Sequence, residues 1–111
     1  MDGLLSLVIP VYNEAESLGP LVDEIDEGLA AHEGPYEIVF VDDGSGYRSF
    51  EVMQGLVEKR DDVRVVRLRR NFGKATALSH GFAAARGDII VTMDGDRQDD
   101  PAEIPGLMAP L

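Results

Sequence analysis

The sequence contains no cysteine among its 111 residues, which excludes disulfide bonds and thiolate metal sites. Basic residues are also scarce: 10 lysines and arginines stand against 21 acidic residues, and the formal net charge is -11. A field of this sign repels the phosphates of nucleic acids. We therefore expect no nucleic-acid partner.

Long apolar stretches are missing as well. No run approaches the roughly 20 apolar residues of a membrane-spanning helix, and the N-terminus lacks the basic segment that begins a secretory signal peptide. A cytoplasmic location is the resulting expectation. The composition is that of a folded protein, because 44% of the residues are hydrophobic, and the length suits one small domain.

Four apolar segments predict strands. The near-continuous runs at residues 4–11 and 37–41 are typical of strands that are buried on both faces. Pro10 has no N–H and should lie at the end of its strand. Residues 63–68 alternate only in part, which favours a strand nearer the sheet edge, and the apolar run within residues 88–93 predicts a fourth buried strand.

Helical periodicity separates these strands. Apolar residues spaced by three and four predict an amphipathic helix over about residues 17–32. The apolar faces of the next two helices are marked by Phe50, Met53, Leu56 and Val57 and by Ala75, Leu78, Phe82 and Ala85. Small residues on the third helix should allow close contact with the sheet: Ala77, Gly81 and Ala84. Gly87 is placed to end this helix as its C′ residue.

Strands and helices alternate along the whole chain, without an internal repeat. This order predicts an α/β fold, with a Rossmann-like parallel sheet, helices on both faces and right-handed crossovers. In such sheets, ligands bind beyond the carboxyl ends of the strands. The segments expected there are residues 10–14, 41–45, 69–74 and 94–98, so their polar side chains should converge on one edge.

The fourth of these segments has the pattern of a metal and diphosphate site. Asp94 and Asp96 are two residues apart, so both carboxylates can face one point beyond the sheet. Gly95 between them leaves room for close approach of a ligand. With the amide oxygen of Gln98 they form a set of oxygen donors that suits Mg²⁺ or Mn²⁺.

Four nearby or isolated polar residues are left out of this set. Asp100 is explained as the N-cap of a fourth helix, and Asp99 is omitted with it. His32 and His80 have no metal-ligand spacing to each other, and we interpret both as structural or surface residues.

Candidate nucleoside-binding residues follow the first two strands. Tyr12 and Glu14 offer a stacking face and an acceptor for the N–H groups of a base, although turn formation and a helix start also explain them. Asp42 or Asp43 can accept from a base or a ribose hydroxyl. The alternative is an Asx turn with Gly44 at positive φ, and two aspartates favour one in each role.

The loop before the third helix carries the densest positive charge in this acidic chain. Arg69 and Arg70 lie in the loop, and Lys74 lies near the helix N-terminus, where anions are favoured. The alternative is a solvated loop whose charges pair with nearby acidic residues.

Four segments together resemble the family 2 glycosyltransferases of the GT-A fold, most of all the polyprenyl-phosphate branch of dolichol-phosphate mannosyltransferases and bactoprenol glucosyltransferases. They are residues 9–14, 41–45, 70–74 and 93–98, with Pro101 following. The sequence departs from the family pattern at Arg97, where an apolar residue is usual, and at Gly95, where alanine is common. Neither departure removes a proposed ligand, although Arg97 alters the local charge.

The resemblance implies a role for individual residues. The nucleotide would be held by Pro10, Tyr12, Glu14, Val41 and Asp43. The diphosphate and the metal would meet Asp94, Gly95 and Asp96, with Gln98 as a further metal ligand and the two aspartates as the catalytic pair. Arg70 and Lys74 would lie on the phosphate or acceptor side.

The resemblance also implies an activity. A hexose would pass, with inversion, from a nucleotide-diphosphate sugar of the GDP-mannose or UDP-glucose type to an acceptor such as polyprenyl or dolichyl phosphate at a membrane surface. Residues 1–111 would form the nucleotide-sugar-binding N-terminal portion of a longer, membrane-associated protein. The oligomeric state stays open, since the edge of an unfinished sheet can pair with another copy.

Two other classes of protein are alternatives to this interpretation. The first is a non-catalytic nucleotide-binding or receiver-like α/β module, but the aspartate and late lysine of a receiver cannot be placed. The second is a nucleotidyltransferase, which needs a basic glycine-rich loop after the first strand. Residues 12–14, with the sequence Tyr-Asn-Glu, have the wrong chemistry for that loop.

Overall fold

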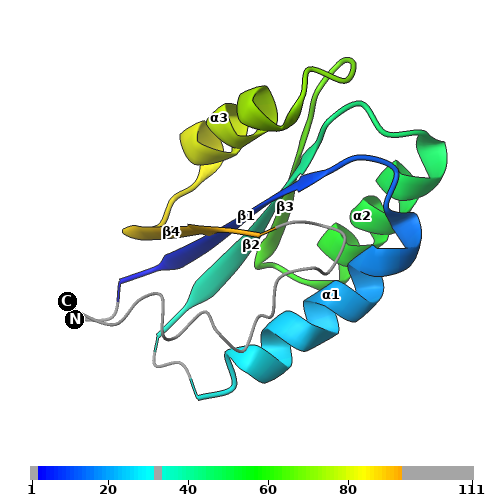
Figure 1. Cartoon of the computed structure of the whole chain (residues 1–111). Helices are drawn as coiled ribbons and strands as arrows, with labels where there is room; N and C mark the ends of the chain where they lie inside the picture. The colour runs from blue at the N-terminus through cyan, green and yellow to red at the C-terminus, as the bar shows by residue number, and fades with distance from the viewer. Residues whose placement is uncertain (1–2, 32–33, 94–111) are drawn as a thin grey trace.

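The computed structural model describes residues 3–31 and 34–93, and within them the chain folds into four strands and three helices (Figure 1). The strands are β1 (Leu5–Val11), β2 (Tyr36–Asp42), β3 (Val63–Arg67) and β4 (Ile89–Thr92). The helices are α1 (Ala15–Gly28), α2 (Tyr47–Lys59) and α3 (Lys74–Ala84). The predicted alternation is therefore confirmed for these elements. The predicted fourth helix lies outside the described residues.

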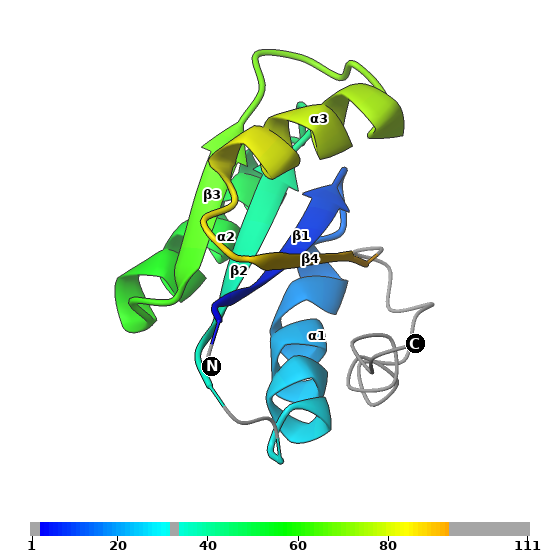
Figure 2. The same ribbon diagram turned by 90° about the vertical axis from the view of Figure 1, so that its left-hand side faces the viewer.

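The strands form one parallel sheet in the order β3-β2-β1-β4. The chain adds β2 and β3 on one side of β1 and then crosses over to place β4 on the other side (Figure 2). The direction of strand addition thus reverses between β1 and β4, and in α/β sheets ligands bind at such a switch point. As predicted, β3 lies at the edge of the sheet formed by the described strands, and Pro10 is the next-to-last residue of β1.

Helices cover both faces of the sheet, as the sequence predicted. Helices α1 and α2 lie on one face and α3 lies on the other (Figure 1). Side chains alternate between the two cores along β1, so Leu7 and Ile9 pack toward α1 and α2 while Val8 packs toward α3. Central strands buried on both faces explain the near-continuous apolar runs.

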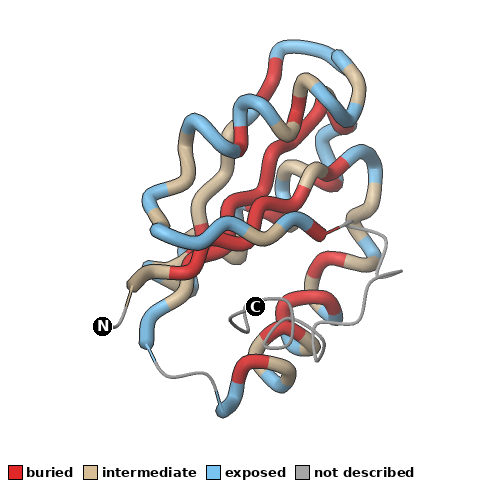
Figure 3. The backbone as a smooth tube through the Cα atoms, turned by 60° about the vertical axis from the view of Figure 1, so that its left-hand side comes forward, coloured by how far each residue is buried: buried red, intermediate tan, exposed pale blue. Residues whose placement is uncertain are grey.

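The fourth strand is more exposed than its apolar sequence predicts. Ile89 and Ile90 keep 43% and 41% of their surface exposed, and Figure 3 shows β4 as mostly exposed beside the buried strands β1 and β2. The expectation of a buried strand is therefore wrong for the described part of the chain. The reason is its position, because β1 is its only strand neighbour among the described residues.

The predicted packing face of α3 is also wrong in part. Ala75 and Phe82 are exposed, whereas the buried residues of the helix are Ala77 and Gly81. A Cβ atom on Gly81 would collide with the side chains of Val8 and Val41. The helix lies so close to the sheet that only small side chains fit between them, as expected for Ala77 and Gly81. Larger side chains of the helix lie at the margins of this contact.

Gly87 does not end this helix as its C′ residue. The helix ends at Ala84, and Gly87 is not among the glycines with positive φ. Its N–H donates to the Ser6 hydroxyl at 2.8 Å, and a Cβ there would lie 2.6 Å from the Leu4 carbonyl oxygen. Glycine is required at this position because the backbone of Gly87 passes close to the start of β1, which sequence spacing does not reveal.

Helix α1 begins and ends earlier than predicted, at Ala15 and Gly28.

A buried network supports the end of α3. Glu37 of β2 is 6% exposed and accepts hydrogen bonds from the Ser6 hydroxyl, the Arg86 N–H and the Arg64 guanidinium. Arg64 also donates to the Ala84 carbonyl at 2.6 Å, which caps the helix. Burial by itself would raise the pKa of Glu37, but these donors together outweigh it and lower the pKa below its ordinary value.

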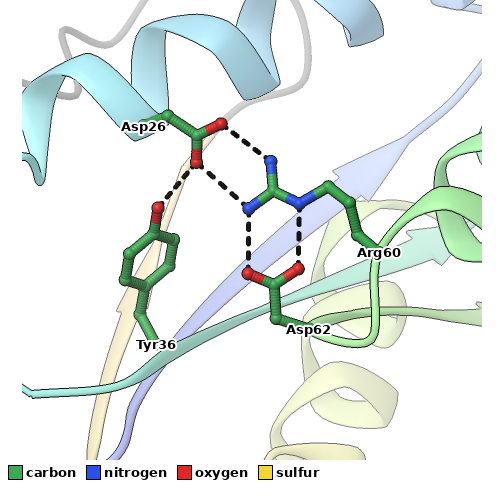
Figure 4. A network of polar contacts seen from close by, with 4 residues as sticks. All are labelled: Asp26, Tyr36, Arg60 and Asp62. Carbon is green, nitrogen blue, oxygen red and sulfur yellow. Dashed lines mark hydrogen bonds and ion pairs between the residues drawn. The ribbon is translucent and has the colours of Figure 1, made fainter.

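A second network lies at the amino end of the sheet (Figure 4). The Tyr36 hydroxyl donates to Asp26 at 2.6 Å, and Arg60 donates to both Asp26 and Asp62 at 2.8 Å. These hydrogen bonds raise the pKa of Arg60 and lower that of Asp62. The network ties α1 to the start of β2 and to the turn before β3.

None of the helices in the described ranges is long and apolar enough to cross a membrane.

Candidate functional site

The loops that follow β1, β2 and β3 meet at the carboxyl edge of the sheet. Hydrogen bonds hold the strand ends in register: Asp43 N–H donates to the Val11 carbonyl, and Leu68 N–H to the Asp42 carbonyl, both at 2.8 Å. On this edge lie seven residues singled out from the sequence: Pro10, Tyr12, Glu14, Val41, Asp43, Arg70 and Lys74. The other four, Asp94, Gly95, Asp96 and Gln98, lie outside the described residues.

The turn after β1 presents an aromatic ring at this edge. Tyr12 is 48% exposed, and Glu14 is partly buried as the N-cap residue of α1. Ser17 N–H donates to the Glu14 carbonyl at 3.0 Å, so the helix start considered for this segment is real. The Tyr12 ring nevertheless keeps an exposed surface on which a planar base can stack.

The two neighbouring aspartates at the end of β2 make different contacts. Asp42 is fully buried, and its Oδ1 accepts the Ser45 N–H at 2.8 Å. Gly44 has a φ of 79°, so this is the Asx turn with a glycine at positive φ. The other oxygen of Asp42 has no hydrogen-bond donor within the described residues and lies 3.7 Å from the Arg67 Nε. Asp42 is therefore a structural residue of the turn.

Asp43 anchors the loop between β3 and α3. Its carboxylate accepts from the N–H groups of Phe72 and Gly73 at 2.8 and 3.1 Å and from the Asn71 side chain at 3.3 Å. These contacts engage three of the roughly four acceptor positions of the carboxylate, and the residue is 4% exposed. Sequence reasoning missed this anchoring role, since the partners lie 28 to 30 residues away along the chain.

The anchored loop carries positive charge and an aromatic ring. The Arg70 guanidinium lies 4.7 Å from the centre of the Phe72 ring, and both side chains are exposed. Arg69, Arg70 and Phe72 line a hollow of about 420 Å³. Lys74 opens α3, whose first turn has no acidic residue. A phosphate group is favoured near such a helix start and its basic side chains.

A second hollow, of about 460 Å³, lies between the starts of α1 and α2. It is lined by Asn13, Glu14, Ala15, Glu16, Ser17, Gly46, Arg48 and Ser49. Arg48 and Glu16 form an ion pair at 3.5 Å on its rim, where both are largely exposed. No sequence pattern pointed to this hollow, because its lining is mostly polar and comes from the starts of two helices that are far apart in the chain.

The predicted metal ligands follow directly after β4. Met93, the last described residue, is 4% exposed, and its N–H donates to the Val8 carbonyl at 3.1 Å. Thr92, the last residue of β4, is the register partner of Val8, so β4 ends beside the carboxyl half of β1, three residues before β1 itself ends. Among residues 3–31 and 34–93 there is no group of three or more His, Cys, Asp or Glu residues that could hold a metal ion.

Comparison with known proteins identifies the chain. The family model described as "Glycosyl transferase family 2" matches residues 6–111. The chain is 40% identical over 113 residues to a dodecaprenyl-phosphate galacturonate synthase of Rhizobium johnstonii, an alignment that covers 96% of this chain and 32% of the relative. It is 45% identical over 107 residues to an undecaprenyl-phosphate 4-deoxy-4-formamido-L-arabinose transferase of Pseudomonas aeruginosa, covering 95% and 31%.

A solved structure gives the same result at the level of the fold. The mannosyltransferase PcManGT from Pyrobaculum calidifontis, in complex with GDP-Man and Mn²⁺, matches with a TM-score of 0.77 and 25% identity over 99% of this chain and 34% of that chain. The fold is thus that of the N-terminal part of GT-A glycosyltransferases, and the chain spans about a third of the length of these relatives. The chain belongs to glycosyltransferase family 2.

Proposed function

We propose that this chain forms the donor-binding part of an inverting glycosyltransferase, which transfers a sugar from a nucleotide-diphosphate sugar to a polyprenyl phosphate. The observation that carries the proposal is that the loops with Tyr12, Glu14 and Asp43 follow the two central strands, β1 and β2, at the carboxyl edge of a family 2 sheet. Ligands of open α/β sheets bind at that place.

The proposed nucleotide pocket uses the ends of the two central strands. Tyr12 stacks on the base, and Glu14 and the remaining acceptor position of Asp43 receive its N–H or ribose O–H groups. Pro10 and Val41 are register partners in β1 and β2 and would lie below these side chains, where Val41 is fully buried. The supporting geometry is the exposure of the Tyr12 ring and the anchored loop beside Asp43.

The proposed diphosphate and metal site comprises Asp94, Gly95, Asp96 and Gln98, with Arg70 and Lys74 on the phosphate or acceptor side. Oxygen donors of this kind fit Mg²⁺ or Mn²⁺, and the similar mannosyltransferase holds Mn²⁺ with GDP-Man. A bound metal would neutralise the charge that develops on the leaving diphosphate. Asp94 and Asp96 would hold the metal, and the basic loop would orient the phosphates.

The proposed acceptor needs little activation. A lipid phosphate oxygen is already anionic near neutral pH, so a strong general base is unnecessary, and a single displacement inverts the anomeric centre. The sugar class is left broader than a hexose, because the two relatives are named for galacturonate and a formamido-arabinose. We further propose that the full-length protein acts on the cytoplasmic side, at the membrane surface that holds its acceptor.

Calorimetric titration of the full-length protein with UDP and GDP, with and without Mn²⁺, tests the donor site. Binding of one nucleotide, strengthened by Mn²⁺, is expected. Tyr12→Ala should raise the dissociation constant about tenfold, since stacking on a base contributes about 1–3 kcal/mol. Phe82→Ala is the matched control, because Phe82 is also about half exposed but lies in the last turn of α3.

Sugar transfer at saturating Mn²⁺ tests the metal site. Asp96→Ala should abolish most of the turnover, and undiminished transfer would exclude the proposed metal role of this residue. Absence of binding to either nucleotide in the titration would contradict the proposed donor site.

A further inference from the structure

The turn after β1 and the turn after β2 are interlocked by side-chain hydrogen bonds. The Ser45 hydroxyl accepts the Asn13 N–H at 2.9 Å and lies 3.4 Å from the Val11 carbonyl, to which it donates. In return, the Asn13 side-chain oxygen accepts the Gly46 N–H at 2.7 Å. The Asp42 carboxylate accepts a hydrogen bond from the Ser45 N–H and so holds Ser45 in place. The two turns thus fix each other across the ends of the two central strands.

The interlock holds a backbone conformation that needs support. Asn13 has a φ of 52° and is the only non-glycine residue with positive φ in the described part of the chain. Asparagine tolerates this region better than most residues, but the conformation still costs free energy. Asn13 and Tyr12 are both exposed, so apolar packing does not hold this turn. Its shape therefore depends on the hydrogen bonds to Ser45 and Gly46.

We infer that Asn13 and Ser45 are positioning residues of the donor site, which hold Tyr12 and Glu14 in the orientation that binds the nucleotide. The inference rests on the proposed function and adds two residues that do not themselves meet the ligand. Asn13 lies between the two binding residues, so a change in its φ redirects both of them. Gly46, the N-cap residue of α2, has no side chain for capping, so the same bonds also set where α2 begins.

Four variants separate the hydrogen bonds from the residues that make them. Ser45→Ala removes the hydroxyl, and Asn13→Gly keeps the positive φ accessible but removes the side-chain acceptor. Ser45→Thr retains a hydroxyl, and Asn13→Asp retains an acceptor oxygen. Tyr36→Phe is the matched control for stability, because it deletes one hydrogen bond of 2.6 Å in the network at the opposite end of the sheet (Figure 4).

Titration of the full-length variants with the nucleoside diphosphate that the wild type binds tests the inference. Ser45→Ala and Asn13→Gly should raise its dissociation constant about tenfold, the effect of one or two lost hydrogen bonds. The KM for the donor should rise with little change in kcat, as for a loss of ground-state binding. The dissociation constants of Ser45→Thr and Asn13→Asp should stay within about twofold of the wild-type value. Tyr36→Phe should leave nucleotide binding unchanged, although its melting temperature should be similar to those of Ser45→Ala and Asn13→Gly.

Two results would overturn the inference while the proposed function stands: wild-type affinity in both Ser45→Ala and Asn13→Gly, or an equal loss of affinity in Tyr36→Phe. A wild-type protein that binds neither UDP nor GDP would overturn both proposals. If Ser45→Ala fails to fold, Asn13→Gly gives the answer, since Asn13 is exposed and its replacement leaves the core intact.

Discussion

Gly81 tests how closely α3 packs on the sheet. Helix propensity alone predicts that alanine at this helical position stabilises the protein by about 1 kcal/mol. A Cβ atom there, however, would collide with Val8 and would lie 2.9 Å from a methyl group of Val41. Both valines are fully buried, and their β-branched side chains have few alternative rotamers. The helix would therefore have to move away from the sheet.

The expected magnitude follows from these two opposing terms. Overpacking a well-packed core costs about 1–3 kcal/mol, and the rigid partners place Gly81→Ala in the upper part of that range. The net expectation is a loss of about 1–2 kcal/mol, after the gain in helix propensity is subtracted. Urea unfolding measures this as a lower midpoint at an unchanged m-value.

Gly55 supplies the matched control. It lies inside α2, and a Cβ atom there would meet nothing within 4 Å, so Gly55→Ala should stabilise the protein by about 1 kcal/mol. Gly19 of α1 is less suitable, because it precedes Pro20 and a side chain before proline disfavours the helical conformation. The reasoning would be refuted if Gly81→Ala stabilised the protein as much as Gly55→Ala does.

Two further predictions concern Glu37 and Gly44. Glu37→Gln should destabilise the protein by about 2–3 kcal/mol at neutral pH, less than for a fully buried pair because Arg64 is partly exposed. Since the folded-state pKa of Glu37 lies below the ordinary 4.5, its contribution is present above that pH and is lost as the pH falls through the lower value. Urea unfolding should therefore show the gap between wild type and variant narrowing below pH 4.5, and a constant gap would contradict this. Gly44→Ala should cost more than about 2 kcal/mol, because its φ is 79° and a Cβ would collide with the backbone of the loop that Asp43 anchors. Nucleotide affinity should fall with it, and an unchanged affinity in calorimetry would show that the loop does not shape the donor site.

The architecture could be predicted from the sequence because its signals are local. Near-continuous apolar runs mark β1 and β2 since both of their faces are buried, and partial alternation marks β3 since it lies at an edge. The fourth strand shows the limit of this reasoning. Its apolar run is the same kind of signal, yet β4 has only one strand neighbour in the described part of the sheet and stays exposed.

The sequence predicted where the candidate site lies in the fold, but it did not predict the hydrogen bonds within the site. Parallel strands bring their carboxyl ends together, so the sequence already located Tyr12, Glu14 and Asp43 at one edge. It did not reveal that Asp43 holds the loop with Phe72. Nor did it reveal the hydrogen bond between Asn13 and Ser45, which are 32 residues apart in the chain.

The sequence by itself determined the alternation of strands and helices, the edge at which the polar loops meet, and the family resemblance carried by four short segments. Periodicity and turn chemistry encode these properties within a few neighbouring residues. Only the tertiary structure decided the strand order, the face of α3 that meets the sheet, and which aspartate holds which turn. These depend on backbone clearance at Gly81 and on hydrogen bonds between residues far apart in the chain, which local patterns do not contain.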